Sequence, residues 1–167
     1  MKQNKVFILE NRGVLYLHGE DVEEFLQNII TNDIKKVTDS TSCFASILTP
    51  QGKYLYDFII IKHKKGFFID CDKTQIEDLL KQLMLYKLKS KVEILNLSNE
   101  FVIATFSKEK FISFKNSKNK PGHTLRFRED PIVLDPRNSE LGGRLLINLE
   151  KLYLSIKKLD LKIGNID

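Results

Sequence analysis

The chain has 167 residues, of which 42% are hydrophobic and 29% are charged, a composition typical of globular proteins. This length suits one domain or two small lobes that share a core, and it needs neither disulfides nor metal to fold. No apolar run approaches the ~20 residues of a transmembrane helix, and "MKQNKVFILENRG" lacks the apolar region of a signal peptide. The sequence therefore predicts no membrane span and a cytoplasmic location.

The net charge of +5 comes mainly from lysine, because the chain has only five arginines. The lysine-rich segments "HKKG" (63–66) and "KNSKNK" (115–120) are typical of solvated turns rather than of a groove that follows a nucleic acid. We therefore expect no nucleic-acid partner. A small anionic ligand suits the same charge.

The two cysteines, Cys43 and Cys71, each lie inside an apolar, strand-like segment. Such cysteines are usually reduced and buried in proteins of reducing compartments. The three histidines are scattered and have no spacing suited to zinc. No metal site is predicted.

The first thirty residues predict a hairpin followed by a helix. The segments "KVFILE" and "VLYLH" flank Asn11-Arg12-Gly13, a short turn that favours a hairpin. The segment "EDVEEFLQNII" then places apolar side chains at helical spacing from Val22 to Ile30. Its early acidic residues lie where the helix dipole favours negative charge.

A meander and a second helix follow. Strands are predicted at 43–48, 53–62 and 67–71, and the "TPQG" turn between the first two has Pro and Gly where a type I turn favours them. Thr74 and Glu77 have the spacing of a capping box. They predict a helix to about residue 88, and residues 91–97 return to strand.

This order resembles the split-βαβ plan, an antiparallel sheet with two helices on one face. The predicted fold class is α+β, with a ferredoxin-like lobe over residues 1–98. Residues 99–167 predict a second, smaller, β-rich lobe. It has strands at 101–106 and 110–115, another strand ending at "GGRLLI", and a helix around 149–159.

Standard catalytic motifs are absent from the sequence. The segment "TPQGK" lacks the upstream glycine of a P-loop, and "LGGR" is not a dinucleotide fingerprint. No Gly-x-Ser-x-Gly elbow or cysteine-nucleophile signature occurs. No catalytic residue is predicted.

The sharpest candidate is Asp57, a carboxylate inside the apolar run "YLYDFIII". In a regular strand, Leu55, Asp57, Ile59 and Ile61 share one face. Burying an unpaired carboxylate is costly. Asp57 is therefore either a structural acid, bonded to backbone or lysine, or a cavity carboxylate that accepts hydrogen bonds from a ligand.

Three tyrosines and two polar residues after the first helix are further candidates. Tyr54, Tyr56 and Tyr86 either pack in the core or supply rings and hydroxyls to a ligand. Asn32 and Asp33 either cap the helix end or face the same cavity as the carboxylate.

Two arginines, Arg137 and Arg144, flank "NSELGG". A guanidinium binds a carboxylate or phosphate with two parallel hydrogen bonds. These residues therefore either clamp an anionic tail or form surface salt bridges.

Five segments occur in one order: "YLHGEDVEEFLQNIITNDI", "FASILTPQGKYLYDFIII", "FFIDCD", "LMLYKLKSKVEI" and "LDPRNSELGGRLL". Together they resemble the tetrahydrofolate-binding family of iron–sulfur cluster assembly and repair proteins (YgfZ-like). That family is related to the aminomethyltransferase, or T-protein, of the glycine cleavage system. The resemblance covers roughly residues 5–155.

The resemblance implies small α+β lobes around a folate cavity, tetrahydrofolate as ligand, and an iron–sulfur client or assembly protein as partner. It implies that Asp57 faces the pterin, with Tyr54, Tyr56 and Tyr86 packed along it. Asn32 and Asp33 would face the same cavity. A basic side chain, Lys87 or Arg144, would meet the glutamate tail.

The sequence departs from the family in two respects. T-proteins are expected to carry two successive acids where this chain has Tyr56-Asp57, which argues against aminomethyl transfer. The Lys-Gly-Cys-Tyr-x-Gly-Gln-Glu motif of the iron–sulfur branch does not occur. We therefore expect folate binding without turnover by this chain. The alternatives are an aminomethyltransferase-like enzyme and a truncated paralogue that acts as an interaction module.

Overall fold

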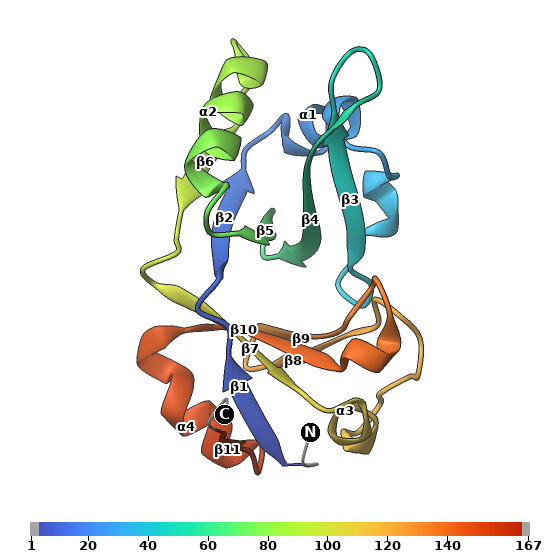
Figure 1. The fold of residues 1–167 in the computed structure, drawn as a ribbon, viewed down its shortest axis with the longest axis vertical. Coiled ribbons are helices and arrows are strands. Elements are labelled where there is room, and N and C mark those ends of the chain that lie inside the picture. Colours follow the sequence, from blue (N-terminus) through green and yellow to red (C-terminus); the bar gives the residue numbers. More distant parts are fainter. Residues whose placement is uncertain (1–3, 165–167) are drawn as a thin grey trace.

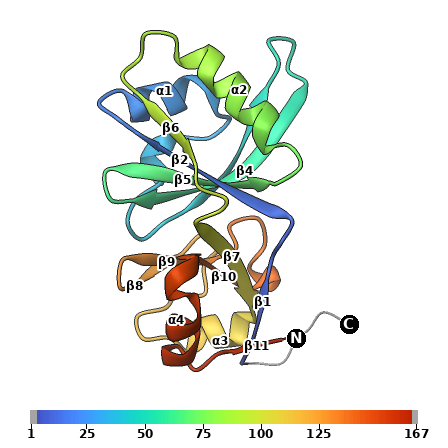
Figure 2. The ribbon, with the colours of Figure 1, turned by 90° about the vertical axis from the view of Figure 1, so that its left-hand side faces the viewer.

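The computed structural model describes residues 4–164. They form two lobes stacked along the long axis of the molecule, each built on one mostly antiparallel sheet (Figure 1; Figure 2). The α+β class predicted from the sequence is therefore confirmed. The division at residue 98 stays a prediction, although a segment near the N-terminus joins the sheet of the second lobe.

The first lobe contains a five-stranded sheet in which all neighbouring strands are antiparallel. In spatial order its strands are β3 (Cys43–Leu48), β4 (Tyr54–His63), β5 (Gly66–Asp72), β2 (Arg12–His18) and β6 (Glu93–Asn96). The helical elements of this lobe are α1 (Val22–Ile29), η1 (Ile34–Lys36) and α2 (Ile76–Lys87).

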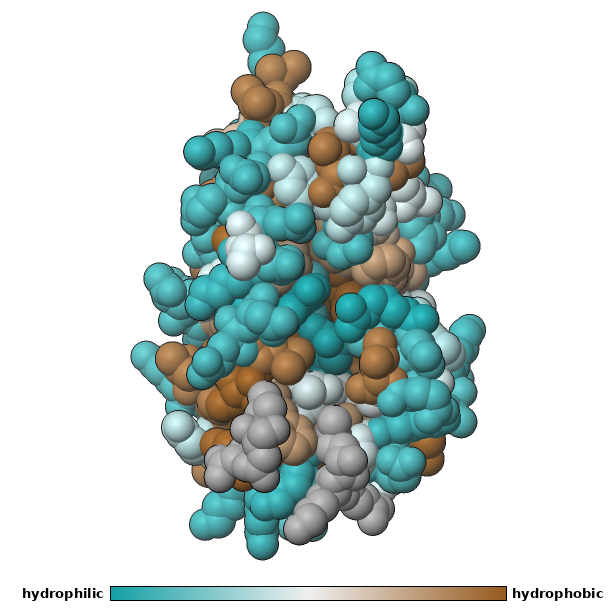
Figure 3. Space-filling model, in the orientation of Figure 1, coloured by the Kyte–Doolittle hydropathy of each residue, from teal (hydrophilic) through white to brown (hydrophobic). Residues whose placement is uncertain are grey.

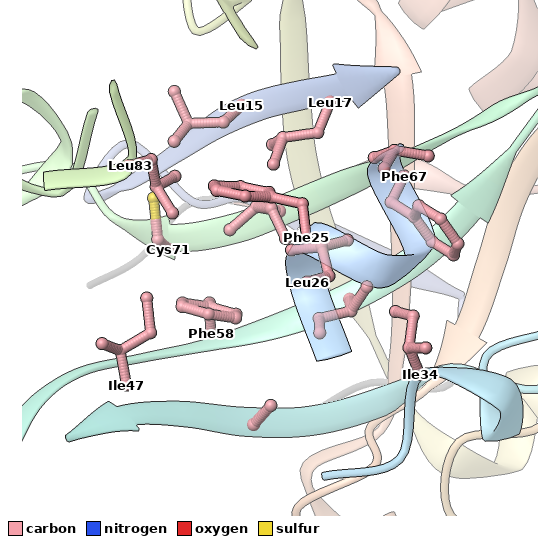
Figure 4. Close-up of a cluster of buried hydrophobic side chains, with 14 of the residues drawn as sticks. Leu15, Leu17, Phe25, Leu26, Ile34, Ile47, Phe58, Phe67, Cys71 and Leu83 are labelled. Carbon is pink, nitrogen blue, oxygen red and sulfur yellow. The ribbon is translucent and has the colours of Figure 1, made fainter. Parts of the chain in front are cut away.

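Both α-helices of the first lobe pack on the sheet face that points away from the second lobe (Figure 2). The predicted helical spacing is confirmed in α1, whose Val22, Phe25 and Leu26 are buried. Figure 4 shows Phe25 and Leu26 beside Phe58, Cys71 and others from the strands. The buried side chains of this cluster are all apolar.

The second lobe contains a six-stranded sheet and two short helices. In spatial order its strands are β11 (Lys162–Ile163), β1 (Lys5–Ile8), β7 (Phe101–Phe106), β10 (Gly143–Asn148), β9 (Asp130–Leu134) and β8 (Thr124–Phe127). The helical elements are α3 (Lys108–Ser113), η2 (Ser139–Leu141), η3 (Leu149–Lys151) and α4 (Leu152–Lys158). Its core includes Phe106 and Phe111, with Leu152 from α4.

A third apolar cluster joins the two sheets face to face. Ile59 and Ile61 from β4 and Phe68 from β5 pack with Ile103 from β7 and Val133 from β9. The lobes therefore share a core.

A polar segment, residues 38–42, also crosses from the first lobe to the edge of the second sheet. The backbone N–H of Thr124 donates to the carbonyl of Ser40 at 2.9 Å, and that of Ser42 donates to the carbonyl of Gly122 at 2.8 Å. The buried hydroxyls of Ser42 and Thr124 lie 2.7 Å apart. These contacts fix one lobe against the other.

The predicted N-terminal hairpin is wrong. Its first strand, β1, pairs with β7 and β11 in the second lobe, whereas β2 pairs with β5 and β6 in the first. The two segments are adjacent in sequence, but each finds its hydrogen-bond partners in a different sheet.

Two local predictions are also wrong. The helix α2 begins at Ile76 without a side-chain cap, because Thr74 donates from both its N–H and its hydroxyl to Asp72 instead of forming a capping box with Glu77. Residues 110–115 do not form a strand. Ser107 accepts a hydrogen bond from the N–H of Lys110 and starts helix α3 in their place.

Candidate functional site

A β-bulge decides which side chains of β4 share a face with Asp57. Where β4 pairs with β3, Asp57 lies opposite Ser46 and Tyr54 lies opposite Leu48. Between these pairs, Leu55 of β4 has no partner in β3. Leu55 and its neighbour Tyr56 both pack on the helix-covered core. The expectation that Leu55 shares the face of Asp57 is therefore wrong, because a bulge breaks the alternation.

The face of β3 and β4 that points to the second lobe carries Phe44, Ser46, Leu48, Tyr54 and Asp57, which we call the junction face. Its burial changes along β4. Ile59 and Ile61 are fully buried in the shared core, Asp57 is half-buried, and Tyr54 is exposed. Asp57 thus lies where the junction opens to solvent, with apolar side chains beside it.

Asp57 acts electrostatically on two other side chains. Burial raises the pKa of Tyr54, and a hydrogen bond to Asp57 adds to that rise. The hydrogen bond from Arg137 to Asp135 raises the pKa of Arg137, and the charges of Asp135, Asp70 and Asp57 contribute in the same direction. The charge of Asp57 therefore acts on a phenol of its own strand and, more weakly, on a guanidinium of the other lobe.

On the same side of the sheet, buried ion pairs connect the lobes. Asp70 of β5 is 1% exposed and accepts from Arg12 Nε at 2.8 Å. It also accepts from Nε and Nη2 of Arg144 in β10, at 2.9 and 2.7 Å. Arg144 thus forms a buried inter-lobe pair rather than a surface salt bridge, and its guanidinium is already occupied.

Asp135, which follows β9, extends this network toward the surface. It is fully buried and accepts from the backbone N–H, Nε and Nη2 of Arg137 at 2.9, 3.0 and 2.7 Å. Its Oδ2 lies 3.7 Å from Nη1 of Arg144. The network thus alternates in charge, and Figure 3 shows hydrophilic side chains gathered at the waist between the lobes.

Asn32 and Asp33 lie beside the outer edge of β3. The amide of Asn32 donates to the carbonyl of Phe44 at 3.0 Å, and Asp33 accepts from the N–H of Lys35 as the cap of η1. Asn32, together with Lys36, Cys43, Phe44 and Lys120, lines a cavity of about 400 Å³ that reaches the second lobe. Asn32 thus meets a cavity at the lobe junction, whereas Asp33 makes a local cap.

The predicted tyrosines divide between the two faces. Burial raises the pKa of Tyr56, and the charges of Asp78 and Tyr86 add to this. Tyr56 and Tyr86 therefore lie near one another on the helix-covered side. Only Tyr54 shares the junction face with Asp57.

Lys87 lies at the other end of the first sheet. Its Nζ donates to the carbonyl of Val92 at 2.7 Å, and it lines a crevice of about 440 Å³ with His18 at the end of β2. Phe58, Cys71 and Gly13 lie opposite one another in the strands β4, β5 and β2. Asp57 is the neighbour of Phe58 in β4, so it lies level with the start of β2. The structure therefore does not bring Lys87 to Asp57.

Both cysteines are free and buried, as the sequence predicted. Burial raises the pKa of Cys71 to about 12, and it also raises the pKa of Cys43. Such thiols are poor nucleophiles. Within residues 4–164, no group of three or more histidine, cysteine, aspartate or glutamate side chains is placed to hold a metal ion.

Sequence reasoning missed Asp70 and Asp135, the two most buried acids of the junction. The signal for Asp70 was present, because "FFIDC" is as apolar as the run around Asp57. Asp135 lies in "LDPR", where nothing local reveals its burial. The roles of the predicted ligand-binding residues stay predictions.

No family model matches the chain. Three relatives are iron–sulfur cluster assembly factors called IBA57 or IBA57 homologue, mitochondrial. The identity is 31% with that of Neurospora crassa, 27% with that of Homo sapiens and 23% with that of Dictyostelium discoideum. The matches cover 83–84% of this chain but only 34–42% of the relatives. The chain thus spans about two fifths of the length of these curated relatives.

Two solved structures share the fold. The glycine cleavage system aminomethyltransferase T from Bartonella henselae has a TM-score of 0.74 and 12% identity, over 95% of this chain and 47% of that one. The heterotetrameric sarcosine oxidase from Corynebacterium has a TM-score of 0.65 and 10% identity, over 96% and 84%. At these identities the likeness concerns the fold alone. No helix within residues 4–164 is long and apolar enough to cross a membrane, and the cytoplasmic location stays a prediction.

Proposed function

We propose that the chain binds tetrahydrofolate and serves iron–sulfur cluster assembly or maintenance, without turnover of its own. Two findings support this: its homologues are iron–sulfur cluster assembly factors, and its fold is that of the glycine cleavage aminomethyltransferase T. The partner would be an iron–sulfur client or assembly protein.

The position of Asp57 carries this proposal. It is a half-buried carboxylate on the junction face, beside the exposed side chains of Leu48 and Tyr54, and its negative charge contributes to the raised pKa of Arg137 in the other lobe. A carboxylate accepts two parallel N–H donors. A pterin presents such donors on one edge of a flat ring, and Tyr54 and Leu48 offer exposed apolar surface to the ring.

The anionic tail of folate suits the cavity beside β3. Lys36 and Lys120 border that cavity, with Asn32 as a hydrogen-bonding side chain. Arg144 is occupied by Asp70, and Lys87 lies at the far end of the sheet. We therefore assign the tail to the two lysines of the cavity.

Binding is favoured over aminomethyl transfer by the direction of Tyr56. This residue precedes Asp57 but packs on the helix-covered core. Position 56 therefore supplies no second carboxylate to the junction face. Formation of methylene-tetrahydrofolate from an aminomethylated carrier would overturn this assignment.

The direct test is a titration of the purified chain with tetrahydrofolate under anaerobic conditions, followed by calorimetry because the chain has no tryptophan. We expect saturable one-to-one binding. Asp57→Asn should weaken it about 10- to 100-fold, the loss typical of a charge-assisted hydrogen bond.

Asp160→Asn is the matched control, because Asp160 is an exposed acid that follows α4 in the second lobe, outside the junction face. It should leave the affinity unchanged. Absence of binding by the unmodified chain would refute the proposal, and equal affinity in Asp57→Asn would remove the role of Asp57.

One observation favours the interaction module as a second candidate. Met84, Leu85 and Leu88 at the end of α2 are exposed, Leu88 by 82%, and an apolar group protrudes at the upper end of Figure 3. Exposed apolar patches often mark partner surfaces. A complex with an iron–sulfur assembly protein that Leu88→Ser abolishes, in a chain that binds no folate, would favour this role.

A further inference from the structure

Arg126 of β8 is a partly buried arginine that no carboxylate neutralises directly. Three other arginines, Arg12, Arg137 and Arg144, each form an ion pair with a buried carboxylate. In the described part of the chain, the side chain of Arg126 makes one hydrogen bond, from Nε to the backbone carbonyl of Asp39 at 3.2 Å. Its Nη2 is buried and has no hydrogen-bond partner among these residues.

The charge of this guanidinium is therefore poorly compensated. Burial lowers the pKa of Arg126, and the charge of Asp39, which is an exposed acid, opposes this. A cation that is partly removed from water is stabilised by an anion nearby. Asp70 and Asp135 supply that anion to the other three arginines, whereas the position beside Arg126 is open to an anion from outside the chain.

Arg126 borders a cavity of about 340 Å³ in the second lobe. Residues 124–127 of β8 form one side of this cavity, and residues 114–116, which follow α3, form another. Five apolar side chains that belong to the second-lobe core or pack against it complete the wall: Phe114, Leu125, Phe127, Ile132 and Leu159. The cavity is at the small end of the range of ligand sites, so it suits a molecule of about one ring and a charged group.

The rim of this cavity is positively charged. Lys115 is a second cation in the lining, and the described residues of the lining include no aspartate or glutamate. Two further cations lie over aromatic rings of the wall, with Lys110 Nζ 5.4 Å from the ring of Phe114 and Arg128 Cζ 5.6 Å from the ring of Phe127. A ligand with negative charge is therefore favoured over a neutral one.

Local contacts hold the segment that carries Lys115 beside β8. The backbone N–H of Ser117 donates to the carbonyl of Phe114 at 3.2 Å. Nε2 of His123, the residue before β8, lies 3.3 Å from the carbonyl oxygen of Asn116. The two sides of the cavity are thus connected by the protein itself.

We propose that this cavity binds a small organic anion, with a carboxylate or phosphate at Arg126 and Lys115 and an apolar body against the wall. Nε of Arg126 is bound to Asp39 and Nη2 is buried, so Nη1 is the donor that the ligand meets. Guanidinium groups bind carboxylates and phosphates through charge-assisted hydrogen bonds. The inference does not depend on the proposed function, because this cavity shares no lining residue with the cavity beside β3 and contains no residue of the junction face.

The test is an NMR titration of the full chain with benzoate at constant ionic strength. We expect saturable shifts in the backbone amides of residues 114–116 and 124–127. Benzyl alcohol, which has the same ring without the charge, should bind at least about ten-fold more weakly. Phenyl phosphate carries a phosphate on the same ring, so the tighter of the two anions identifies the preferred head group.

Two variants test the cations. Arg126→Gln removes the charge and the Nη1 donor and should weaken benzoate binding about 10- to 100-fold. Because this change also affects the contact with Asp39 in the other lobe, Lys115→Gln is the second variant, with an expected loss of about two- to five-fold. Lys118→Gln, an exposed lysine of the same segment that does not line the cavity, is the matched control, and thermal melting of each variant reports the fold.

Three results would overturn the inference. The first is equal binding of benzoate and benzyl alcohol, which would leave an apolar crevice that does not recognise charge. The second is the absence of saturable shifts at the amides of the cavity. The third is an affinity for benzoate that Lys115→Gln and a folded Arg126→Gln both leave unchanged. Because the titration contains no tetrahydrofolate, each result leaves the proposed function as it stands.

Discussion

The two faces of the first-lobe sheet are built from the same strands but differ in chemistry. The helix-covered face buries only apolar side chains, among them Phe58, Ile60 and Cys71. The face toward the second lobe also has an apolar centre around Ile59, but it carries Asp57 and Asp70 at its margin.

The two faces therefore differ in what their burial costs. An apolar face is sufficient to hold two helices on a sheet. Burying charges is costly unless each one is paired. The charges of the junction therefore set the relative position of the lobes and leave one partly paired carboxylate at the surface.

The largest effect is expected from breaking the buried network. Asp70→Asn keeps the shape of the side chain but removes the counter-charge of Arg12 and leaves the buried Arg144 with only the more distant carboxylate of Asp135. We expect the free energy of unfolding to fall by about 3–5 kcal/mol. Chemical denaturation measures this, with Asp160→Asn as the exposed control. A loss below 1 kcal/mol would mean that the pair behaves like a surface salt bridge.

A core substitution on the helix-covered face should separate stability from binding. Leu79 of α2 is fully buried, and Leu79→Ala should cost about 2–5 kcal/mol through lost burial and the cavity that remains. Because Leu79 lies on the opposite face from Asp57, the affinity for tetrahydrofolate under folding conditions should stay the same. A large loss of affinity in a folded variant would show that the two faces are coupled.

The junction should also make stability depend on pH. His63 is buried against Phe68, with ring centroids 4.5 Å apart, and burial lowers its pKa to about 4. Lys64 and Arg126 lower the pKa further, whereas Glu129 opposes them. The unfolded chain takes up this proton near pH 6.5, so the free energy of unfolding falls as the pH drops from about 6.5 to 4, by at most about 3 kcal/mol.

His63→Phe should remove this part of the pH dependence, because a phenylalanine ring can pack on Phe68 without taking up a proton. Urea denaturation at pH 7 and pH 5 measures the change. The same pair of measurements on His123→Gln is the control. An unchanged slope in His63→Phe would assign the pH dependence to other groups.

Much of the fold could be predicted from local patterns, and the exceptions share one cause. The helix at Val22 and the meander from Cys43 follow from periodicity and turn residues. The N-terminal hairpin failed because pairing partners lie far apart in sequence, with Val6 opposite Phe106 and Lys5 opposite Lys162. Local apolar runs predict that a strand exists but not which sheet it joins.

The candidate site was less predictable than the fold. The isolated acid in an apolar strand directed attention to Asp57, yet the same rule applied to Asp70, the more deeply buried residue. The bulge at Leu55 changed the face assignment of the tyrosines. Arg144 meets Asp70 only through tertiary packing, which no spacing in the sequence encodes.

The smallest expected effect comes from residues 110–115, where the sequence predicted a strand and the structure has part of helix α3. "KFISFK" alternates apolar and polar residues, but Ser107 accepts a hydrogen bond from the N–H of Lys110 at 3.1 Å and starts α3, which buries Phe111. Ser107→Ala should lower the free energy of unfolding by about 1 kcal/mol through loss of the cap, whereas Ser107→Thr, which keeps a hydroxyl, should lose less. Hydrogen exchange of the Lys110 amide and chemical denaturation measure both. If the segment were a strand, Ser107→Ala would leave the exchange rate of the Lys110 amide unchanged. The experiment therefore tests whether the hydrogen bond of a helix cap outweighs the alternating apolar pattern of a strand.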